Sequence, residues 1–399
     1  MSSYILATGT SVPPHTMSQD AALEAFQDLA CPDDRRRRLA KVMFDRAQVE
    51  NRFTFVPVKA LYQWFVDEKT PVQQITRGGP LTSVPDPLPE IIPGANPGLS
   101  TGQRMRLYEL YAAELAIESA KKAIQSANRT PSEITHLVTV SCTGFAAPGV
   151  DVSLIKSLGL PPTTQRTHIG FMGCHGAING IRTAMNITTA NPAATVLLCC
   201  VELCLLHGEF QWDEDDNKKI IGNALFADGS ASLVVSGNQG NGNQDSGNAN
   251  WEIVDTGSVL IEDSETELCW NIGDHGFEMI LNSDIGDRIE AALADWLSQW
   301  LDSQGLTFSD IDCWAVHPGG PKIIKSVQQS LDLSDQQLST SLDVLRRYGN
   351  MSSPTVLFVL EEFTKAMDAT AAPAKPRYAI IIAFGPGMVA EVGLLRMNG

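Results

Sequence analysis

Cysteine, histidine and asparagine side chains at three distant positions could together form a nucleophilic site. Cys174 lies in IGFMGCHGAINGIR, where an apolar run meets glycine and then an amphipathic helix. A thiol at a helix start is predicted to have a lowered pKa, because the positive end of the helix dipole favours the thiolate. Gly173 and Gly176 would let a substrate or a neighbouring backbone approach closely. Taken singly, a cysteine is more often a buried inert thiol, and this simpler interpretation fits Cys142, Cys199, Cys200, Cys204, Cys269 and Cys313.

His317 and Asn350 are the polar partners that the sequence offers to this cysteine. His317 ends the apolar run CWAV and opens the loop HPGGPK, whereas Asn350 lies in YGNMSSPTVLFVLEEF, a loop that enters an apolar helix. Both residues also have a purely structural interpretation, His317 as a core histidine and Asn350 as a helix-capping asparagine. His175 follows the cysteine directly but is predicted to point away from it. The buried strand predicted at 378–383 is followed by a rigid turn, whose backbone could form one side of a site. The turn consists of Gly385, Pro386 and Gly387.

No familiar cofactor motif accompanies these residues. The chain has no GxGxxG sequence opening a βαβ unit, no GxxxxGK[ST] and no HExxH. Cys199, Cys200 and Cys204 lack the paired CxxC spacing of a zinc site. The run Asp213–Asp216 is typical of a solvated turn. The sequence therefore predicts chemistry without a metal or a redox cofactor.

Length and charge exclude several classes of protein. The chain has 399 residues, is 43% hydrophobic and carries a net charge of −17. Its length exceeds the roughly 250–300 residues at which single cores stop growing, so two domains or one multilayer fold are predicted. The negative charge repels phosphate backbones and argues against a nucleic-acid partner. Because no apolar run approaches the roughly 20 residues that cross a bilayer, and no secretion signal is present, we expect a cytoplasmic protein without a membrane partner.

Two similar halves of alternating helix and strand are predicted to position the candidate residues. TPSEITHLVT at 130–139 matches TFSDIDCWAV at 307–316, and each follows a long helical pattern and ends in a buried strand. Asn350 follows Cys174 at nearly the spacing of this repeat, so both would occupy equivalent helix starts. The pattern favours a duplicated α/β unit, with chance similarity of two helix–strand units as the alternative. Helices are predicted at 21–55, 107–126 and 285–303, and buried strands at 5–8, 136–142, 194–200, 231–236 and 378–383.

Composition suggests where the halves divide. Residues 237–250, GNQGNGNQDSGNAN, form a low-complexity polar connection. We therefore predict an N-terminal half at 1–236 that carries the cysteine, a linker at 237–250, and a C-terminal half at 251–399 that carries the histidine and the asparagine. Residues 71–98 are rich in proline and glycine and are predicted to form an irregular excursion without an assigned role.

The cysteine at a helix start, HPGGPK, YGNMSS and FGPG, in this order, resemble the type III polyketide synthases, the chalcone-synthase-like enzymes. The resemblance covers nearly the whole chain. It implies a thiolase fold, with two similar halves in five alternating layers (αβαβα), and a homodimer. It also implies catalytic roles for Cys174, His317 and Asn350, and it maps two gating phenylalanines to Phe226 and Phe277.

The implied reaction agrees with the chemistry of these side chains. A Cys174 thiolate paired with protonated His317 would attack an acyl-CoA thioester and hold the acyl group. Malonyl-CoA would then lose CO₂, and neutral donors from His317 and Asn350 would stabilise the enolate. Repeated extension and cyclisation would follow. Acyl-CoA and malonyl-CoA are substrates in this scheme, and no resident cofactor is needed.

Several positions depart from the plant chalcone synthases. By the same resemblance, Ala147 replaces a methionine that reaches across the dimer, and Leu268 stands where a cavity glycine is expected. Cavity threonines are replaced by Cys142, Cys204 and His207. Ser352 and the turn of Gly385, Pro386 and Gly387 are implied to contact the substrate. These changes favour bacterial relatives that use fatty-acyl starters and make alkylpyrones or alkylresorcinols.

Basic residues for the CoA phosphates are only partly retained. The resemblance implies CoA contacts for Arg46 and Lys322, whereas other such positions fall on Leu39 and Val42. The run Arg35–Arg38 could compensate, although a solvated helix face is the simpler explanation.

Two other functions stay open at the level of sequence. One is a β-ketoacyl-acyl carrier protein synthase of the same fold, which performs a single condensation. HPGGPK and FGPG favour the type III enzymes over it. The other is a catalytically silent homologue that serves as a scaffold, and the retention of all three polar positions argues against that.

Overall fold

A nine-stranded mixed sheet forms the centre of the computed structural model, which describes residues 2–55, 99–208, 210, 218–238, 251–282, 284–368 and 376–397. β1 pairs with β7 on one side and, through a short antiparallel contact, with β8 on the other. The strands of the two halves therefore join in one sheet. Its order is β11 (Ile311–Val316), β12 (Arg377–Gly385), β13 (Val389–Met397), β8 (Trp251–Leu260), β1 (Ser3–Ser11), β7 (Asp228–Ser236), β6 (Thr195–Leu203), β4 (His136–Ser141) and β5 (Gln165–Gly170).

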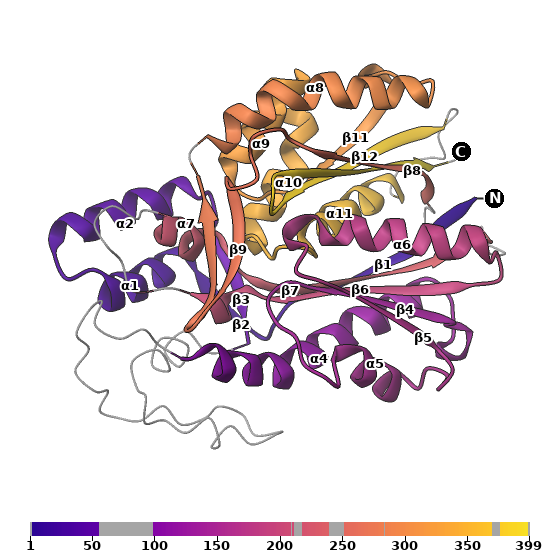
Figure 1. Cartoon of the computed structure of the whole chain (residues 1–399), viewed down its shortest axis with the longest axis horizontal. Helices are drawn as coiled ribbons and strands as arrows, with labels where there is room; N and C mark the ends of the chain where they lie inside the picture. The colour runs from indigo at the N-terminus through magenta and orange to yellow at the C-terminus, as the bar shows by residue number, and fades with distance from the viewer. Residues whose placement is uncertain are drawn as a thin grey trace.

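Helices alternate with the two parts of this sheet in five layers (Figure 1). One outer layer holds α8 (Ile285–Ser303) with α9 (Pro321–Leu331), and the opposite one holds α4 (Thr101–Ser126) with α5 (Val150–Leu158). The middle layer consists of α6 (Gly176–Ala190) and α11 (Thr355–Asp368). This arrangement confirms the predicted duplicated αβαβα fold.

Strand sequences explain why both faces of the sheet are covered. In β6, Val196, Leu198 and Cys200 face the middle helices, whereas the alternate residues Leu197 and Cys199 face α4. Successive side chains of a strand point to opposite faces, so an uninterrupted apolar strand needs a helix layer on each side. Full burial of each such aliphatic side chain contributes about 1.5–3 kcal/mol.

The sequence repeat at 130–139 and 307–316 forms the same local structure twice. Thr130 Oγ1 donates to Glu133 Oε2 at 2.9 Å, and Thr307 Oγ1 donates to Asp310 Oδ2 at 2.7 Å. In both copies the same carboxylate also accepts the backbone N–H of the threonine. Each capped 3₁₀ turn then leads into an equivalent strand, β4 or β11. The shared capping confirms that the two segments are structural copies.

The remaining elements surround one end of the sheet. The predicted helix at 21–55 is wrong as a single element, since the chain forms α1 (Gln19–Ala30), α2 (Asp34–Arg46) and β3 (Asn51–Thr54). Pro32 interrupts the helical pattern because it cannot continue the hydrogen-bond ladder, and β3 pairs with β2 (His15–Ser18). Two further elements, β9 (Leu268–Gly273) and β10 (Gly276–Leu281), form a hairpin beside α7 (Lys218–Leu225).

Three predicted segments fall wholly or mainly outside the described residues, and one of them is the solvated turn predicted at Asp213–Asp216. The excursion at 71–98 lies in the stretch 56–98, and residues 239–250 of the predicted linker are also outside the described structure. β7 ends at Ser236 and β8 begins at Trp251. The division at 237–250 stays a prediction.

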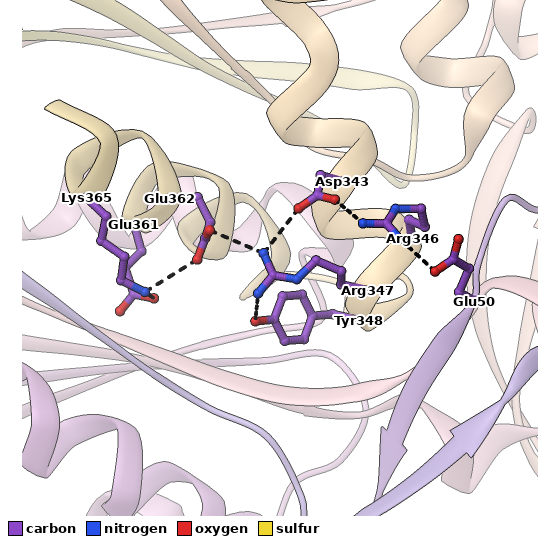
Figure 2. A network of polar contacts seen from close by, with 8 residues as sticks. All are labelled: Glu50, Asp343, Arg346, Arg347, Tyr348, Glu361, Glu362 and Lys365. Carbon is purple, nitrogen blue, oxygen red and sulfur yellow. Dashed lines mark hydrogen bonds and ion pairs between the residues drawn. The ribbon is translucent and has the colours of Figure 1, made fainter. Parts of the chain in front are cut away.

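Ion pairs join the end of α10 (Asp335–Tyr348) to α11 and to the start of β3 (Figure 2). Arg347 lies between Asp343, at 3.1 Å, and Glu362, at 3.3 Å, and its Nη2 donates to the Tyr348 hydroxyl at 2.8 Å. Arg346 reaches Glu50 at 2.6 Å. These charges are partly exposed, so each pair contributes only about 0–1 kcal/mol. Together they hold the two ends of the loop 349–354, which carries Asn350.

Candidate active site

Cys174 lies in a short 3₁₀ helix, Gly173–His175, that leads into α6. Gly173 has a φ angle of 69°, a conformation that side-chain-bearing residues disfavour. A Cβ atom on Gly173 would lie 2.4 Å from Cδ of Pro386. Only glycine therefore lets this turn approach the turn at 385–387, and the contact places Cys174 at the junction of the two halves.

A mostly apolar cavity of about 40 Å³ lies beside Cys174. A second cavity of about 30 Å³ adjoins it, and Cys204, Phe226, Trp270 and Met279 line both. Volumes of this size hold only about one or two water molecules. With the side chains as they stand, both cavities are therefore too small for a chain of several carbon atoms. The first cavity is lined by Cys142, Thr143, Gly173, Cys174, Cys204, Phe226, Leu268, Cys269, Trp270, Met279, Ser352 and Pro386.

Asn350 is held by its backbone and by its side chain. Its N–H donates to Leu225 O at 2.8 Å, and its carbonyl accepts from Ala227 N at 2.9 Å. Its side-chain Oδ1 accepts from Ser352 N at 2.8 Å, and its Nδ2 donates to Gly319 O at 3.2 Å. The amide is thereby fixed between the Cys174 side of the site and the loop that follows His317.

His317 is buried, with 1% of its surface exposed. Its backbone N–H donates to Ile382 O at 2.8 Å, but neither ring nitrogen has a hydrogen-bond partner within the described part of the chain. Burial, with a smaller effect from the charge of His175, lowers the pKa of His317 to about 3. Buried polar atoms without partners are rare, and they often mark sites where a substrate supplies the missing contact. The ring is therefore a neutral imidazole that is available to a reacting group.

The predicted lowering of the Cys174 pKa is wrong. Burial raises the pKa of the Cys174 thiol to about 11, and the negative charge of Glu202 acts in the same direction. Hydrogen bonds with the side chains of Ser352 and Asn350 lower the pKa but do not outweigh burial. Cys174 as a whole is half-buried, but its side chain lines the mostly apolar cavity, where removal from water penalises the thiolate. The Cys174 thiol and the His317 imidazole are therefore both neutral at rest, and no hydrogen bond joins the thiol to either ring nitrogen in the described structure.

Sequence analysis missed Glu202, a fully buried carboxylate beside this site. Its oxygens accept from Ser353 Oγ at 2.6 Å, Thr143 Oγ1 at 2.7 Å, and the backbone N–H groups of Cys142 and Thr143 at 2.9 and 3.0 Å. Burial raises its pKa. A single acidic residue at the end of the apolar strand TVLLCCVEL was the signal that could have revealed it. Glu202 ties the backbone after β4 to the start of α11.

An aromatic cluster closes the second cavity. The ring of Phe277, itself fully buried, stacks on His207 with a centroid distance of 4.2 Å and meets Trp270 edge-on at 5.8 Å. His207 Nε2 donates to Thr143 O at 2.6 Å, and its Nδ1 accepts from Phe277 N at 2.9 Å. Burial lowers the pKa of His207 to about 3, so the ring is neutral. Trp270, which the sequence did not reveal, donates from Nε1 to Cys142 O at 2.7 Å.

The predicted cavity residues divide into three groups. Those that line the cavity beside Cys174 are Cys142, Cys204, Phe226, Leu268, Ser352 and Pro386, and those of the adjoining cavity include Phe226, His207 and Phe277. Gly385 and Gly387 line neither cavity; Gly385 packs against His175, and Gly387 N donates to Leu268 O. Arg46 and Lys322 are exposed, at the end of α2 and the start of α9, and also lie outside both linings.

A larger groove, of about 860 Å³, opens on the surface between α2 and α10. Its lining contains none of the predicted site residues. It carries one arginine, which is paired with Glu50, and five carboxylates, a lining that repels CoA phosphates: Asp20, Asp45, Glu50, Asp335 and Asp343. We therefore place the chemistry in the smaller cavities.

Asp228, which follows Phe226 closely, makes protein stability depend on pH. It is 3% exposed and accepts from Leu205 N at 2.9 Å, and burial raises its pKa to about 7. Because the unfolded pKa is about 3.9, the folded chain binds this proton more tightly. The stability that Asp228 contributes is therefore complete below about pH 4 and is lost as pH rises through 7.

The variant Asp228→Asn has no titrating group at this position, so its comparison with wild type isolates the contribution of Asp228 to the pH dependence of stability. Urea unfolding between pH 5 and 8 should show wild type losing stability relative to the variant as pH rises, by about 2–3 kcal/mol across this range. Asp302→Asn, at the exposed end of α8, serves as the control. Parallel curves for wild type and Asp228→Asn would contradict a protonated Asp228.

Within the described ranges, no cluster of three or more histidine, cysteine or acidic residues could hold a metal ion. The helices of these ranges also include none that is long and apolar enough to span a membrane.

Comparisons with known proteins agree with this geometry. Residues 83–239 match the N-terminal domain of the chalcone and stilbene synthases, and residues 252–398 match the C-terminal domain. An alpha-pyrone synthesis polyketide synthase-like protein of Mycobacterium tuberculosis is 31% identical over 97% of this chain and 88% of the relative. The 1,3,6,8-tetrahydroxynaphthalene synthase of Streptomyces peucetius is 30% identical over 98% of this chain and 92% of the relative.

A solved structure shows the same architecture. The crystal structure of PKS-I from the brown alga Ectocarpus siliculosus superposes with a TM-score of 0.84 and 31% identity, covering 99% of this chain and 98% of that one. The five-layered model is thus a thiolase fold of the type III kind. The chain belongs to the chalcone and stilbene synthase family, the type III polyketide synthases, which are enzymes that transfer acyl groups.

Proposed function

We propose that this protein condenses malonyl-CoA iteratively onto an acyl-CoA starter that is held as a thioester on Cys174, and that the product cyclises to a pyrone or a resorcinol. The observation that supports the proposal is that the side chains of Ser352 and Asn350 reach the Cys174 thiol, and that Cys174 and Ser352 line the same mostly apolar cavity. Nδ2 of the same amide contacts the loop of His317. Nucleophile, base and hydrogen-bond donor are thus supplied from both halves.

Acyl loading begins with a proton transfer. A ring nitrogen of His317 takes the proton of the Cys174 thiol as the sulfur attacks the thioester carbonyl. The bond between carbonyl carbon and CoA sulfur breaks, and the CoA thiolate leaves with that proton. Because Cys174 and His317 are both neutral at rest, the thiolate and the imidazolium, which burial disfavours, exist only during the reaction.

Extension uses the loss of CO₂ from malonyl-CoA. The bond between the malonyl α-carbon and its carboxylate breaks, and the electron pair forms a thioester enolate. Neutral N–H donors of His317 and Asn350 stabilise the developing oxyanion. The enolate carbon then attacks the acyl carbonyl carbon on Cys174, and the bond between that carbon and the sulfur breaks. The released thiolate attacks the thioester of the extended acyl-CoA for the next round, with CoA as the leaving group, or takes up a proton from water by way of His317.

The starter proposed is a fatty acyl-CoA. Support comes from Cys142, Cys204 and Leu268, which line the cavity where plant enzymes are implied to have threonine and glycine, and from His207 in the adjoining cavity. We place Arg46 and Lys322 on the CoA phosphates. The enzyme is proposed to act in the cytoplasm as a homodimer without a resident cofactor. Exposed β5, which is the edge of the sheet, offers unpaired backbone groups to a second copy.

A carrier-free product assay tests this function. Purified protein is incubated with malonyl-CoA and a series of acyl-CoA starters from short to long chains, without acyl carrier protein, and products are identified by mass spectrometry. Cyclised products with two or more extensions support the proposal. Single-extension products that form only when carrier protein is added would instead favour a β-ketoacyl-acyl carrier protein synthase. No turnover with any starter, together with no acyl adduct on the protein, would favour a silent scaffold.

Trp270 is predicted to limit product length. It lines both cavities, so Trp270→Ala should merge them and shift the product distribution toward more extensions. Trp270 is half-buried, so its truncation to alanine should cost less than the about 3–5 kcal/mol of a fully buried Trp side chain. Trp270→Leu provides a milder variant with the same expected direction. Phe308→Leu, at an aromatic residue far from the cavities, is the matched control. An unchanged product length in both Trp270 variants would show that other side chains set the limit.

A further inference from the structure

A buried polar chain starts at the residue next to the nucleophile and runs away from the cavity. His175 is 2% exposed, and its Nδ1 lies 2.9 Å from Oδ1 of Asn179, one turn along α6. Nδ2 of Asn179 donates to Glu391 Oε1 on β13 at 3.0 Å. The proposed catalysis assigns no part to these three side chains.

Glu391 is surrounded by donors. It is 3% exposed and also accepts from Ser258 Oγ at 2.9 Å and from both terminal nitrogens of Arg182. Arg182 is itself fixed, because Nε donates to Thr256 Oγ1 at 3.0 Å and Nη2 donates to Gly257 O at 3.1 Å. The carboxylate therefore accepts on both oxygens and is ion-paired with Arg182.

This arrangement fixes the proton position on His175. Because a carboxylate only accepts, Asn179 must present its NH₂ group to Glu391 and its oxygen to the imidazole. The imidazole then carries a hydrogen on Nδ1, and Nε2 is the unprotonated nitrogen of the neutral ring. Second-sphere contacts of this kind set the tautomer and the orientation of histidines at reactive sites.

The opposite edge of the His175 ring packs against Gly385, the residue before the cavity-lining Pro386. A Cβ atom on Gly385 would lie 2.2 Å from Cδ2 and 2.6 Å from Nε2 of His175. The glycine is therefore required by the imidazole, and the residue after it, Pro386, lines the cavity beside Cys174. His175 is thus wedged between the nucleophile turn and the turn at 385–387.

We propose that His175 is a positioning residue, held in one neutral tautomer by Asn179, Glu391 and Arg182, and that its neutrality allows His317 to accept the proton of Cys174. The inference rests on the proposed function. Glu391 from β13 and Arg182 from α6 act electrostatically on His175, and His175 acts electrostatically on His317 in the loop after β11. Burial lowers the pKa of His175, and a protonated His175 lowers the pKa of His317. Protonation of His175 would therefore make His317 a weaker base.

The decisive variant is Asn179→Asp in the full-length protein. A carboxylate at Nδ1 favours the protonated His175, so the acid limb of the pH–rate profile should move to higher pH by about one unit, or tenfold in rate at a given pH. The double variant His175→Gln/Asn179→Asp has no titrating imidazole at this position, so the shift to higher pH should be abolished and its acid limb should lie at or below that of the wild type. His175→Gln alone keeps a donor to Asn179 and should extend activity to lower pH. Thr183→Val, on the same helix, is the control.

Two readouts separate this inference from the proposed function. One is the pH dependence of kcat for condensation. The other is the pH dependence of Cys174 alkylation by iodoacetamide, which reports proton transfer to His317 without any acyl-CoA substrate. If both profiles stay unmoved in Asn179→Asp and in His175→Gln, or if the shift persists in the double variant, the inference is overturned. If the alkylation profiles move as expected but no polyketide forms, the proposed function alone fails.

Discussion

Cys174→Ala should lose both the covalent acyl intermediate and the condensation. Intact-protein mass spectrometry after exposure to an acyl-CoA should show the mass of one acyl group on wild type and none on the variant. Product formation should fall by at least about 10³-fold, because removal of a nucleophile eliminates the covalent route. The side chain is small, and its replacement leaves no buried polar atom unpaired, so the fold should be retained.

Cys269→Ala is the matched control for this experiment. Cys269 lines the same cavity but is assigned no role as a nucleophile, so the acyl adduct should persist in that variant. An acyl adduct that remains in Cys174→Ala and disappears in Cys269→Ala would show that Cys269, and not Cys174, is the nucleophile. Peptide mapping of the adduct then identifies the residue directly.

Asn350→Ala should slow the decarboxylation of malonyl-CoA by about 10²–10³-fold, the usual cost of removing one oxyanion donor. The measurement is the release of CO₂ or the formation of acetyl-CoA, made in a Cys174→Ala background so that acyl loading does not contribute. Asn350→Asp places an acceptor-only group at the same position, so at neutral pH it should be at least as slow as Asn350→Ala. Unchanged CO₂ release in both variants would remove Asn350 from the role of enolate donor.

His317→Gln extends the same test to the second donor. Glutamine keeps a neutral N–H but cannot act as a base, so decarboxylation should fall by about tenfold while acyl loading of Cys174 falls further. An equal loss in both half-reactions would indicate that His317 only supports the structure. The comparison is informative because both ring nitrogens are without partners in the described structure.

Local patterns predicted much of the architecture. The helix at 285–303 begins and ends where its amphipathic period does, and the repeated capping turns at 130–133 and 307–310 follow from Thr and an acidic residue three positions apart. The same repeat located Cys174 and Asn350 in equivalent positions before the two middle helices. These features depend on residues close in the chain, which is why a single sequence contains enough information for them.

Other features of the site depended on distant contacts. The pKa of Cys174 was predicted in the wrong direction because burial, which is supplied by segments such as 142–143 and 350–352, outweighs the helix start. Glu202 was missed because the donors that satisfy it come from residues 141–143 and 353. Trp270 was missed because a hairpin strand carries it into a cavity built by other elements.

The amino-acid sequence by itself predicted most helices and strands of the layered core, the candidate residues Cys174, His317 and Asn350, and the family resemblance. Tertiary structure alone decided the protonation of Cys174 and His317, the size of the cavities and the chain of contacts behind His175. The physical reason is that solvent exclusion and hydrogen-bond partnership are properties of a packed neighbourhood, and that neighbourhood is assembled from segments hundreds of residues apart.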